Sequence, residues 1–306
     1  MPASRLAQAA PAVRPSLKAR LMISGPSGAG KTWSALQIAR ALVGPKGSIL
    51  FIDTEQDSAL TYADQFDFTH LPWDAPFSPL DLGQTILDAG KAYDATVIDS
   101  LSHFWTKSGG VLDIADGRFG GWKVARPAQQ DMVDAILGAG NHVLLAVRSK
   151  MEYAQETGSN GRQVVTKLGM EPIQDATLVY EMNVAVEMDM EHRLAVSKSR
   201  ATAVPVGTTF QPGHAPEFGL TYGDWLAGGT QVDAPDADAL MAQIQAMPED
   251  FQAEIKAKWM ERGLPKPAAL TPHQILRVLG IIEQVASDHA AAAKAASEAV
   301  TADPSE

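Results

Sequence analysis

The sequence contains no cysteine, so it can form neither a disulfide framework nor a thiolate metal site. It has no apolar run near the roughly 20 residues that span a bilayer, and its N-terminus lacks the apolar centre of a secretory signal. We therefore expect a cytoplasmic protein without a membrane partner. Residues 1–17 are expected to form a flexible arm.

Positive charge is scarce as well. The chain carries 25 Lys and Arg against 36 Asp and Glu, a net charge of -11, which disfavours a generic polyanion binder. The shortage is uneven, because residues 102–170 carry eight Lys and Arg against six Asp and Glu. This local balance of +2 leaves -13 for everything else, so we expect any polyanion to bind the middle of the chain.

Short apolar runs alternate with helical stretches from residue 19 onward, which is typical of an α/β domain with a mainly parallel sheet. Strands are predicted at 19–24, 48–53, 95–99 and 142–148, with helices after the first three. Two further strands, 178–189 and 192–199, are separated by the pair Met190-Glu191 and predict an antiparallel hairpin.

The apolar periodicity stops around Gly228 and Gly229. We therefore expect the α/β core to cover residues 18–228 and a small helical domain to cover residues 229–289. Residues 290–306 are rich in alanine and polar side chains and are expected to be a disordered tail.

One motif carries most of the chemistry. It matches the P-loop pattern between an apolar strand and a helical stretch, and consists of Gly25, Pro26, Ser27, Gly28, Ala29, Gly30, Lys31 and Thr32. Its glycines let backbone N–H groups cradle phosphate, Lys31 is expected to reach the β- and γ-phosphates, and Thr32 is expected to bind magnesium. A chance Gly-rich turn rarely gives a full match in this context. We predict an ATPase that uses ATP and Mg²⁺.

Two strand ends supply candidate carboxylates. Asp99 ends the strand 95–99 and either caps the next helix or binds the magnesium, which we favour. The strand 48–53 is followed by Glu55, which could activate the attacking water. Asp53 and Asp57 compete with Glu55 for that role.

Residues 101–126 interleave aromatic and cationic side chains among glycines, a composition that suits single-stranded DNA because rings stack bases and cations follow the backbone. The alternative is that the rings anchor an ordered loop in the core. The residues are Phe104, Trp105, Phe119 and Trp122 with Lys107, Arg118, Lys123 and Arg126.

Residues 148–172 predict a flexible hairpin with a polar centre at GSNG. Its cations are Arg148, Lys150, Arg162 and Lys167. The local charge balance favours contact with DNA here too.

With these elements in order, the chain resembles the RecA-type ATPases. More closely, it resembles the compact RecA-like ATPases of bacteriophages, the Sak-type single-strand annealing proteins. The likeness covers roughly residues 18–205 and rests on the order of GPSGAGKT, FIDTE, VIDSLSHFW, VTKLGM and VSKSR.

The resemblance implies ATP-dependent binding of single-stranded DNA and promotion of annealing or strand exchange in phage recombination, inside the bacterial host cell. It also implies that Lys198 and Arg200 complete the ATP site of a neighbouring subunit in a ring or filament. Their alternative roles are solvated strand-end charges or DNA contacts. RecA opens its second DNA loop with a Gln, whereas this chain has Arg148, which we place with the nucleotide-binding residues.

The helical unit after Gly229 does not match the C-terminal domain of RecA, and its candidate partners are DNA, a single-strand-binding protein or a neighbouring subunit. Two other functions stay open, a P-loop nucleotide kinase and a nucleotide-gated switch or DnaB-type motor that acts on a protein partner. Glu55 and the C-terminal hairpin fit a RecA-type hydrolase better.

Overall fold

The structure is a computed structural model. It describes residues 14–118, 120–157, 163–228, 237–261, 267, 278–279, 281–282, 285–286 and 288–290. The chain divides into two compact units, Met1–Gln231 and Val232–Glu306.

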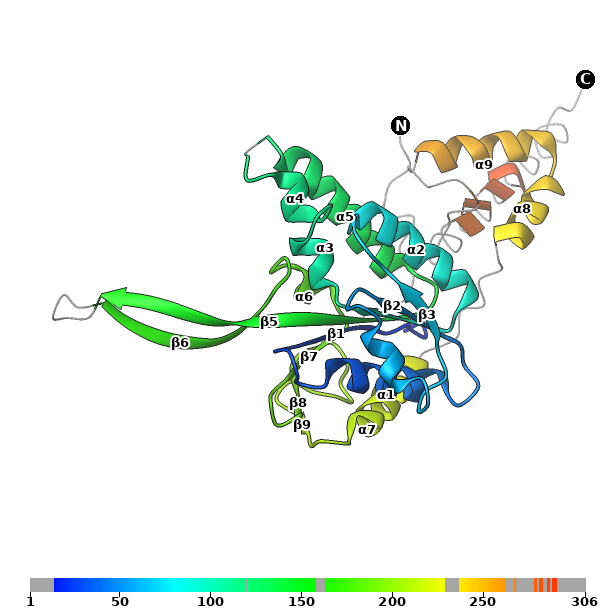
Figure 1. Ribbon diagram of the computed structural model, residues 1–306. Coiled ribbons are helices and arrows are strands. Elements are labelled where there is room, and N and C mark those ends of the chain that lie inside the picture. Colours follow the sequence, from blue (N-terminus) through cyan, green and yellow to red (C-terminus); the bar gives the residue numbers. More distant parts are fainter. Residues whose placement is uncertain are drawn as a thin grey trace, which may run out of the picture. The chain divides into compact units, whose positions relative to one another are not determined.

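The first unit is built on a sheet in the order β3-β2-β4-β5-β1-β7-β8-β9, with β6 paired to β5 (Figure 1). The neighbours from β3 to β7 along this order run parallel, and the β5–β6, β7–β8 and β8–β9 pairs are antiparallel. The strands are β1 (Arg20–Gly25), β2 (Ile49–Asp53), β3 (Thr69–Pro72), β4 (Ala95–Asp99), β5 (His142–Thr157), β6 (Gln163–Pro172), β7 (Val184–Met188), β8 (Leu194–Ser199) and β9 (Thr209–Phe210).

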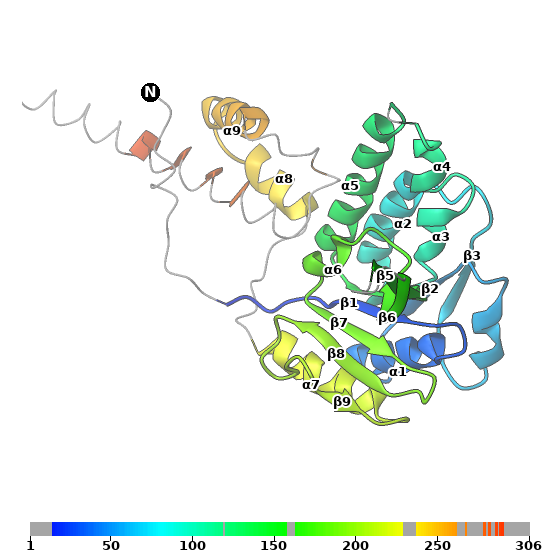
Figure 2. The ribbon, with the colours of Figure 1, turned by 90° about the vertical axis from the view of Figure 1, so that its left-hand side faces the viewer.

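Helices cover both faces of this sheet (Figure 2). α1 and α7 lie on one face, and α2 and α5 lie on the other. The described helices of this unit are α1 (Lys31–Val43), α2 (Pro79–Ala92), α3 (Ser102–Thr106), α4 (Val111–Ala115), α5 (Trp122–Gly138), α6 (Leu178–Glu181) and α7 (Ala215–Ala227), with a 3₁₀ turn at Ser58–Tyr62.

Every residue of β1 is buried, because the central strands of a parallel sheet are covered on both faces. Side chains alternate along a strand, so Leu21 and Ile23 join the core under α1 and α7, while Met22 joins the core under α2 and α5. The expected α/β fold with a mostly parallel central sheet is confirmed.

The hairpin β5–β6 leaves the sheet where β5 passes Arg148. The first part of β5 pairs with β1 and β4, and the part from Ser149 onward pairs with β6. Figure 1 shows the hairpin reaching well beyond the rest of the sheet.

Three sequence-based expectations are corrected. Residues 178–181 form the helix α6 instead of the start of a strand, because a short apolar run fits a buried helical turn as well as a strand. The strand β3 was missed, since its edge position leaves it partly exposed and without an apolar run. Residues 101–126 form α3, α4 and the start of α5 instead of the ordered loop of the alternative interpretation, and α3 lies where a helix was expected after the strand 95–99.

The second unit contains α8 (Ala237–Gln245) and α9 (Glu249–Glu261). Its buried cluster consists of Leu240, Ile244, Ile255, Val278, Ile281, Ile282 and Val285. Within the described parts of both units, no helix has the length and apolar character to cross a bilayer.

Candidate nucleotide-binding site

The P-loop links the end of β1 to the start of α1, and its backbone requires glycine at several places. Gly28 and Gly30 have φ angles of 85° and 87°, a region that side chains rarely adopt. At Gly25, an added Cβ would lie 2.6 Å from the carbonyl oxygen of Met188. Gly30 precedes α1 and provides no side-chain cap, so the first-turn N–H groups stay available for an anion.

A cavity of about 550 Å³ opens beside this loop. Its volume lies in the range of small-molecule sites. The lining residues are Ser27, Gly28, Gly30, Lys31, Thr32, Trp33, Ser34, Gln37, Glu55, Ser58, Tyr62, Asp99, Arg148, Met188, His192 and Gly213. The cavity therefore joins the P-loop to both predicted carboxylate positions.

Lys31 is buried, and its Nζ donates to the carbonyl oxygens of Gly25 and Pro26 at 3.0 and 2.8 Å. Burial lowers the pKa of Lys31, and the nearby Asp99 and Glu55 oppose that shift. The ammonium thus lies inside the curve of the P-loop, where phosphate oxygens are its expected partners.

Thr32 and Asp99 come together at the end of β4. The Thr32 hydroxyl donates to Asp99 Oδ2 at 2.5 Å, and Asp99 is 3% exposed. Burial raises the pKa of Asp99 to about 6, against the opposing effect of the Thr32 hydrogen bond. A cation at this position would favour the ionised carboxylate.

This pair of oxygens fits magnesium. Among the described residues, no group of three or more His, Asp and Glu is arranged to hold a metal ion. Magnesium at phosphate sites takes only one or two protein ligands and completes its shell with phosphate oxygens and water. Thr32 and Asp99 would hold it here.

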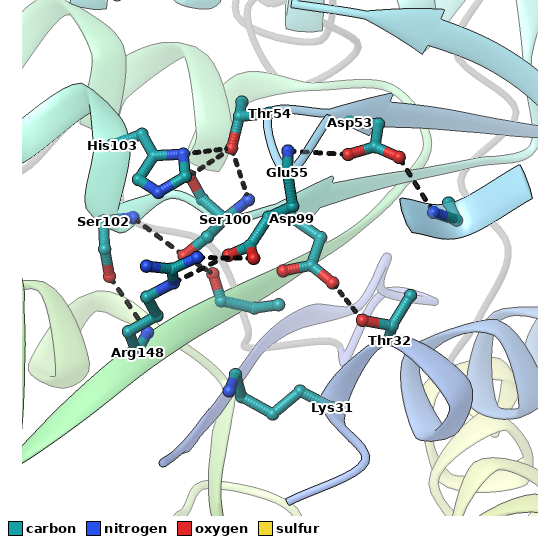
Figure 3. Close-up of polar contacts among 12 residues, drawn as sticks. Lys31, Thr32, Asp53, Thr54, Glu55, Asp99, Ser100, Ser102, His103 and Arg148 are labelled. Carbon is teal, nitrogen blue, oxygen red and sulfur yellow. Dashed lines mark hydrogen bonds and ion pairs between the residues drawn. The ribbon is translucent and has the colours of Figure 1, made fainter. Parts of the chain in front are cut away.

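Glu55 is held by Arg148 (Figure 3). Arg148 Nε donates to Glu55 Oε1 at 2.7 Å, and a terminal guanidinium nitrogen donates to Oε2 at 2.5 Å. Burial raises the pKa of Glu55, but the hydrogen bonds and charge of Arg148, with the charge of Lys31, bring it below its ordinary value. The carboxylate is therefore ionised and fully paired.

The two competing carboxylates are placed differently. Asp53 is 2% exposed and accepts from the N–H groups of Glu55 and Ala59 at 2.7 and 2.9 Å, so it shapes the turn after β2. Asp57 lies 3.6 Å from His70 and is exposed. Glu55 is the one of the three that lines the cavity as the described residues define it. Its role in activating water stays a prediction.

The sequence did not indicate that His103, Thr54 and Ser102 support Glu55 and Arg148. His103 Nδ1 lies 2.7 Å from Thr54 Oγ1, which also accepts from the Ser100 N–H at 2.7 Å (Figure 3). Burial lowers the pKa of His103 to about 4, so its imidazole is neutral. The Ser102 hydroxyl oxygen accepts from the Arg148 N–H at 2.9 Å. The first turn of α3 therefore contacts Thr54, which precedes Glu55, and Arg148, which pairs with it.

The predicted DNA segment 101–126 combines half-buried rings with exposed cations. Trp105 and Trp122 are half-buried, with ring centroids 6.3 Å apart, and pack against a small cluster that includes Val111. The exposed cations are Lys107, Arg118, Lys123 and Arg126. Arg118 is paired with Asp116 at 2.8 Å.

The structure contradicts the prediction that Phe104 contacts DNA. Its side chain is fully buried and packs edge-on against Trp73 and Phe77, with centroids 5.2 and 5.7 Å away. No ring face is free for a base, so Phe104 is a core residue.

On the hairpin, Lys150 is exposed and forms an ion pair with Glu171 at 3.1 Å. The predictions for Phe119 and Arg162, and for the side chain of Lys167, lie outside the described part of the structure.

Lys198 and Arg200 lie at the end of β8 and just after it. Arg200 donates to the carbonyl oxygen of Tyr180 at 2.7 Å, and Lys198 donates to the carbonyl oxygen of Met182. Neither residue lines the P-loop cavity as the described residues define it.

The sheet, the P-loop and the two carboxylate strand ends define a P-loop ATPase. Residues 17–210 match the family model described as AAA domain (AAA_24), which covers more than half of the chain. The chain therefore belongs to this family. The family implies nucleotide binding and hydrolysis, typically with Mg²⁺.

A search of the curated proteins gives no match. Among solved structures, the fold is similar to a KaiC-like protein from the hyperthermophilic archaeon Pyrococcus horikoshii, at 14% identity and a TM-score of 0.38. The alignment covers 62% of this chain and 83% of that chain.

Proposed function

We propose that this ATPase couples its nucleotide cycle to single-stranded DNA and promotes annealing or strand exchange, as a phage recombination protein of the Sak-type group acting in the cytoplasm of a bacterial host. One observation carries the proposal. Both candidate DNA segments begin at residues that touch the turn around Glu55, the hairpin through Arg148 and α3 through His103.

Each site residue has a distinct proposed task. Lys31 holds phosphate charge, and Thr32 and Asp99 would hold magnesium, which supplies charge neutralisation at the phosphates. Glu55 orients or deprotonates the attacking water. Glu55 must be ionised for this role, and its lowered pKa keeps it in that form.

The proposed strand path combines rings and cations. Trp105 and Trp122 are half-buried beside exposed cations, as a stacking platform requires, and one stacked base contributes about 1–3 kcal/mol. Lys150 lies at the base of the hairpin, and the sequence adds Arg162 and Lys167 along it. The residues 102–170, with their local charge balance of +2, thus include both the aromatic segment and the hairpin of an otherwise acidic chain.

We further propose that Lys198 and Arg200 act on the ATP of a neighbouring copy. Both are anchored to the backbone around α6, and neither is among the described residues that line the P-loop cavity. A cation supplied in trans can raise turnover roughly 10³- to 10⁵-fold. A head-to-tail contact of this kind generates a ring or a filament.

ATP turnover is the test. We measure phosphate release alone, with single-stranded DNA, with duplex DNA and with nucleoside monophosphates as phosphate acceptors. Stimulation by single-stranded DNA supports the proposal. Transfer of phosphate to a monophosphate would instead identify a kinase, and turnover indifferent to all these additions would favour a switch or motor that acts on a protein.

A further inference from the structure

The ion pair between Arg148 and Glu55 engages both oxygens of the carboxylate. Both oxygens of Glu55 accept from the guanidinium, at 2.7 and 2.5 Å, in the two-pronged arrangement that Arg makes with carboxylates and phosphates. A carboxylate in this state has a low pKa and its best acceptor directions filled, so it is a poor partner for a water molecule. Glu55 needs a free oxygen to act.

Arg148 lies at a junction between the site and the hairpin. It is the last residue of β5 in register with β1, opposite Gly25 of the P-loop, and the next residue, Ser149, pairs with Pro172 of β6. Its N–H donates to the Ser102 hydroxyl oxygen, and its carbonyl oxygen accepts from the Ile173 N–H at 2.7 Å. The backbone is fixed on both sides, so the side chain is the part that can exchange partners.

The partner that suits this exchange is a phosphate. Arg148 and Lys150 are two residues apart on one strand and project to the same side, so phosphate attracted to exposed Lys150 approaches the guanidinium. The Arg148 side chain is 39% exposed and the Glu55 side chain 23%. Because both side chains are partly exposed, a phosphate can reach the guanidinium and compete with Glu55 for the same two-pronged contact.

We propose that Arg148 is a positioning residue that holds Glu55 inactive and releases it when a phosphate takes over the guanidinium. The phosphate belongs either to a strand bound along the hairpin or to the nucleotide. Only the DNA strand as the source of the phosphate rests on the proposed function. The restraint of Glu55 by Arg148 exists without DNA.

The test compares Arg148→Gln with Arg148→Lys and the wild type. Gln removes the charge and the two-pronged contact, and Lys keeps the charge with a single contact. Lys91→Gln removes an exposed, salt-bridged cation on α2 and serves as the matched control. For each protein we measure kcat and KM for ATP without DNA and with single-stranded DNA, the pH profile of kcat, and the thermal midpoint.

For Arg148→Gln we expect DNA-free kcat to rise about 3- to 10-fold, equivalent to about 0.7–1.4 kcal/mol. Arg148→Lys should be intermediate and the control unchanged. The acid limb of the pH profile should move to higher pH, because Glu55 loses the guanidinium that lowers its pKa. A purely structural role would lower the thermal midpoint without this displacement.

The two phosphate sources give different results. If the strand takes the guanidinium, stimulation by DNA falls toward onefold in Arg148→Gln. If the nucleotide takes it, DNA stimulation persists and affinity falls for ATP but not for ADP. A folded Arg148→Gln protein with an unchanged or lower DNA-free kcat and an unchanged affinity for ATP overturns the inference. Absence of DNA stimulation in the wild type overturns the proposed function alone, because the DNA-free rise still tests the restraint.

Discussion

The hydroxyl of Thr32, in the first turn of α1, donates to the carboxylate of Asp99 at the end of β4, across 67 positions of sequence and 2.5 Å of space. The contact brings together two hard oxygen ligands beside the P-loop, one of them a buried carboxylate whose pKa burial raises to about 6. A bound cation would stabilise the charged form, so this pair is where we expect metal dependence to originate.

Asp99→Asn keeps the shape of the side chain and removes its charge. We expect magnesium-dependent turnover to fall about 10- to 100-fold, as for the loss of other metal-site partners, and to recover in part at high magnesium. Asp94→Asn, at the other end of β4, is the matched control. Equal magnesium titrations for Asp99→Asn and the wild type would remove Asp99 from the metal site.

Lys31→Ala and Glu55→Gln should separate binding from chemistry. Lys31 holds phosphate in both the ground and transition states, so its loss should abolish turnover and weaken nucleotide binding. Glu55→Gln should bind ATP normally and lose about 10²- to 10⁴-fold in turnover. Normal hydrolysis by Glu55→Gln, with Asp53→Asn or Asp57→Asn inactive, would show that another carboxylate activates the water.

DNA affinity should depend on the two central segments. We expect Trp105→Ala and Trp122→Ala each to cost about 1–3 kcal/mol in affinity for single-stranded DNA at fixed salt. Lys167→Ala should reduce the salt slope by about one, and Lys91→Ala should leave both quantities unchanged. If the three variants bind single-stranded DNA like the wild type, the DNA site lies elsewhere, and the C-terminal helices are the next candidate.

A shared active site makes inactive subunits complementary. Lys31→Ala keeps Arg200, and Arg200→Ala keeps the P-loop, so a mixture should regain ATPase activity that neither protein has alone. A mixture of Lys31→Ala with the double variant Lys31→Ala/Arg200→Ala has no intact P-loop and is the control. Full activity of Arg200→Ala alone, or of a monomer, would contradict the shared site.

Acid should destabilise the fold through His142. Its Nδ1 accepts from the Ala19 N–H at 3.0 Å, and burial, with Lys18 and Arg20, lowers its pKa from 6.5 to about 4. The unfolded chain therefore takes up the proton first. The stability present above pH 6.5 should be lost as pH falls toward 4, by roughly 3 kcal/mol for this group.

Urea unfolding at several pH values measures this loss, and His142→Gln should flatten part of the profile. His103, with a pKa also near 4, supplies a second contribution of the same sign. Lys91→Gln changes an exposed side chain on α2 and is the control. Identical slopes for His142→Gln and the wild type would assign the acid sensitivity to other groups.

Local pattern was enough to predict the P-loop, the four central strands and the place of Asp99, because each depends on a short run of apolar residues and a defined turn. It could not predict the pairing of Glu55 with Arg148, which are 93 residues apart. Phe104 shows the same limit. In the sequence, an aromatic residue among glycines fits both a ring that stacks a base and a ring that packs in the core. Only the packing of Phe104 against Trp73 and Phe77 distinguishes the two roles.

The turn between β7 and β8 sits against the P-loop. His192 Nδ1 donates to the Ala29 carbonyl oxygen at 3.0 Å, and an added Cβ on Gly28 would lie 3.7 Å from the Met190 methyl group. β8 begins two residues later and ends next to Arg200. One end of this short strand therefore adjoins the P-loop, and the other end adjoins Lys198 and Arg200. If these cations act on a neighbouring subunit as we propose, β8 would link the phosphate site of one subunit to that of the next.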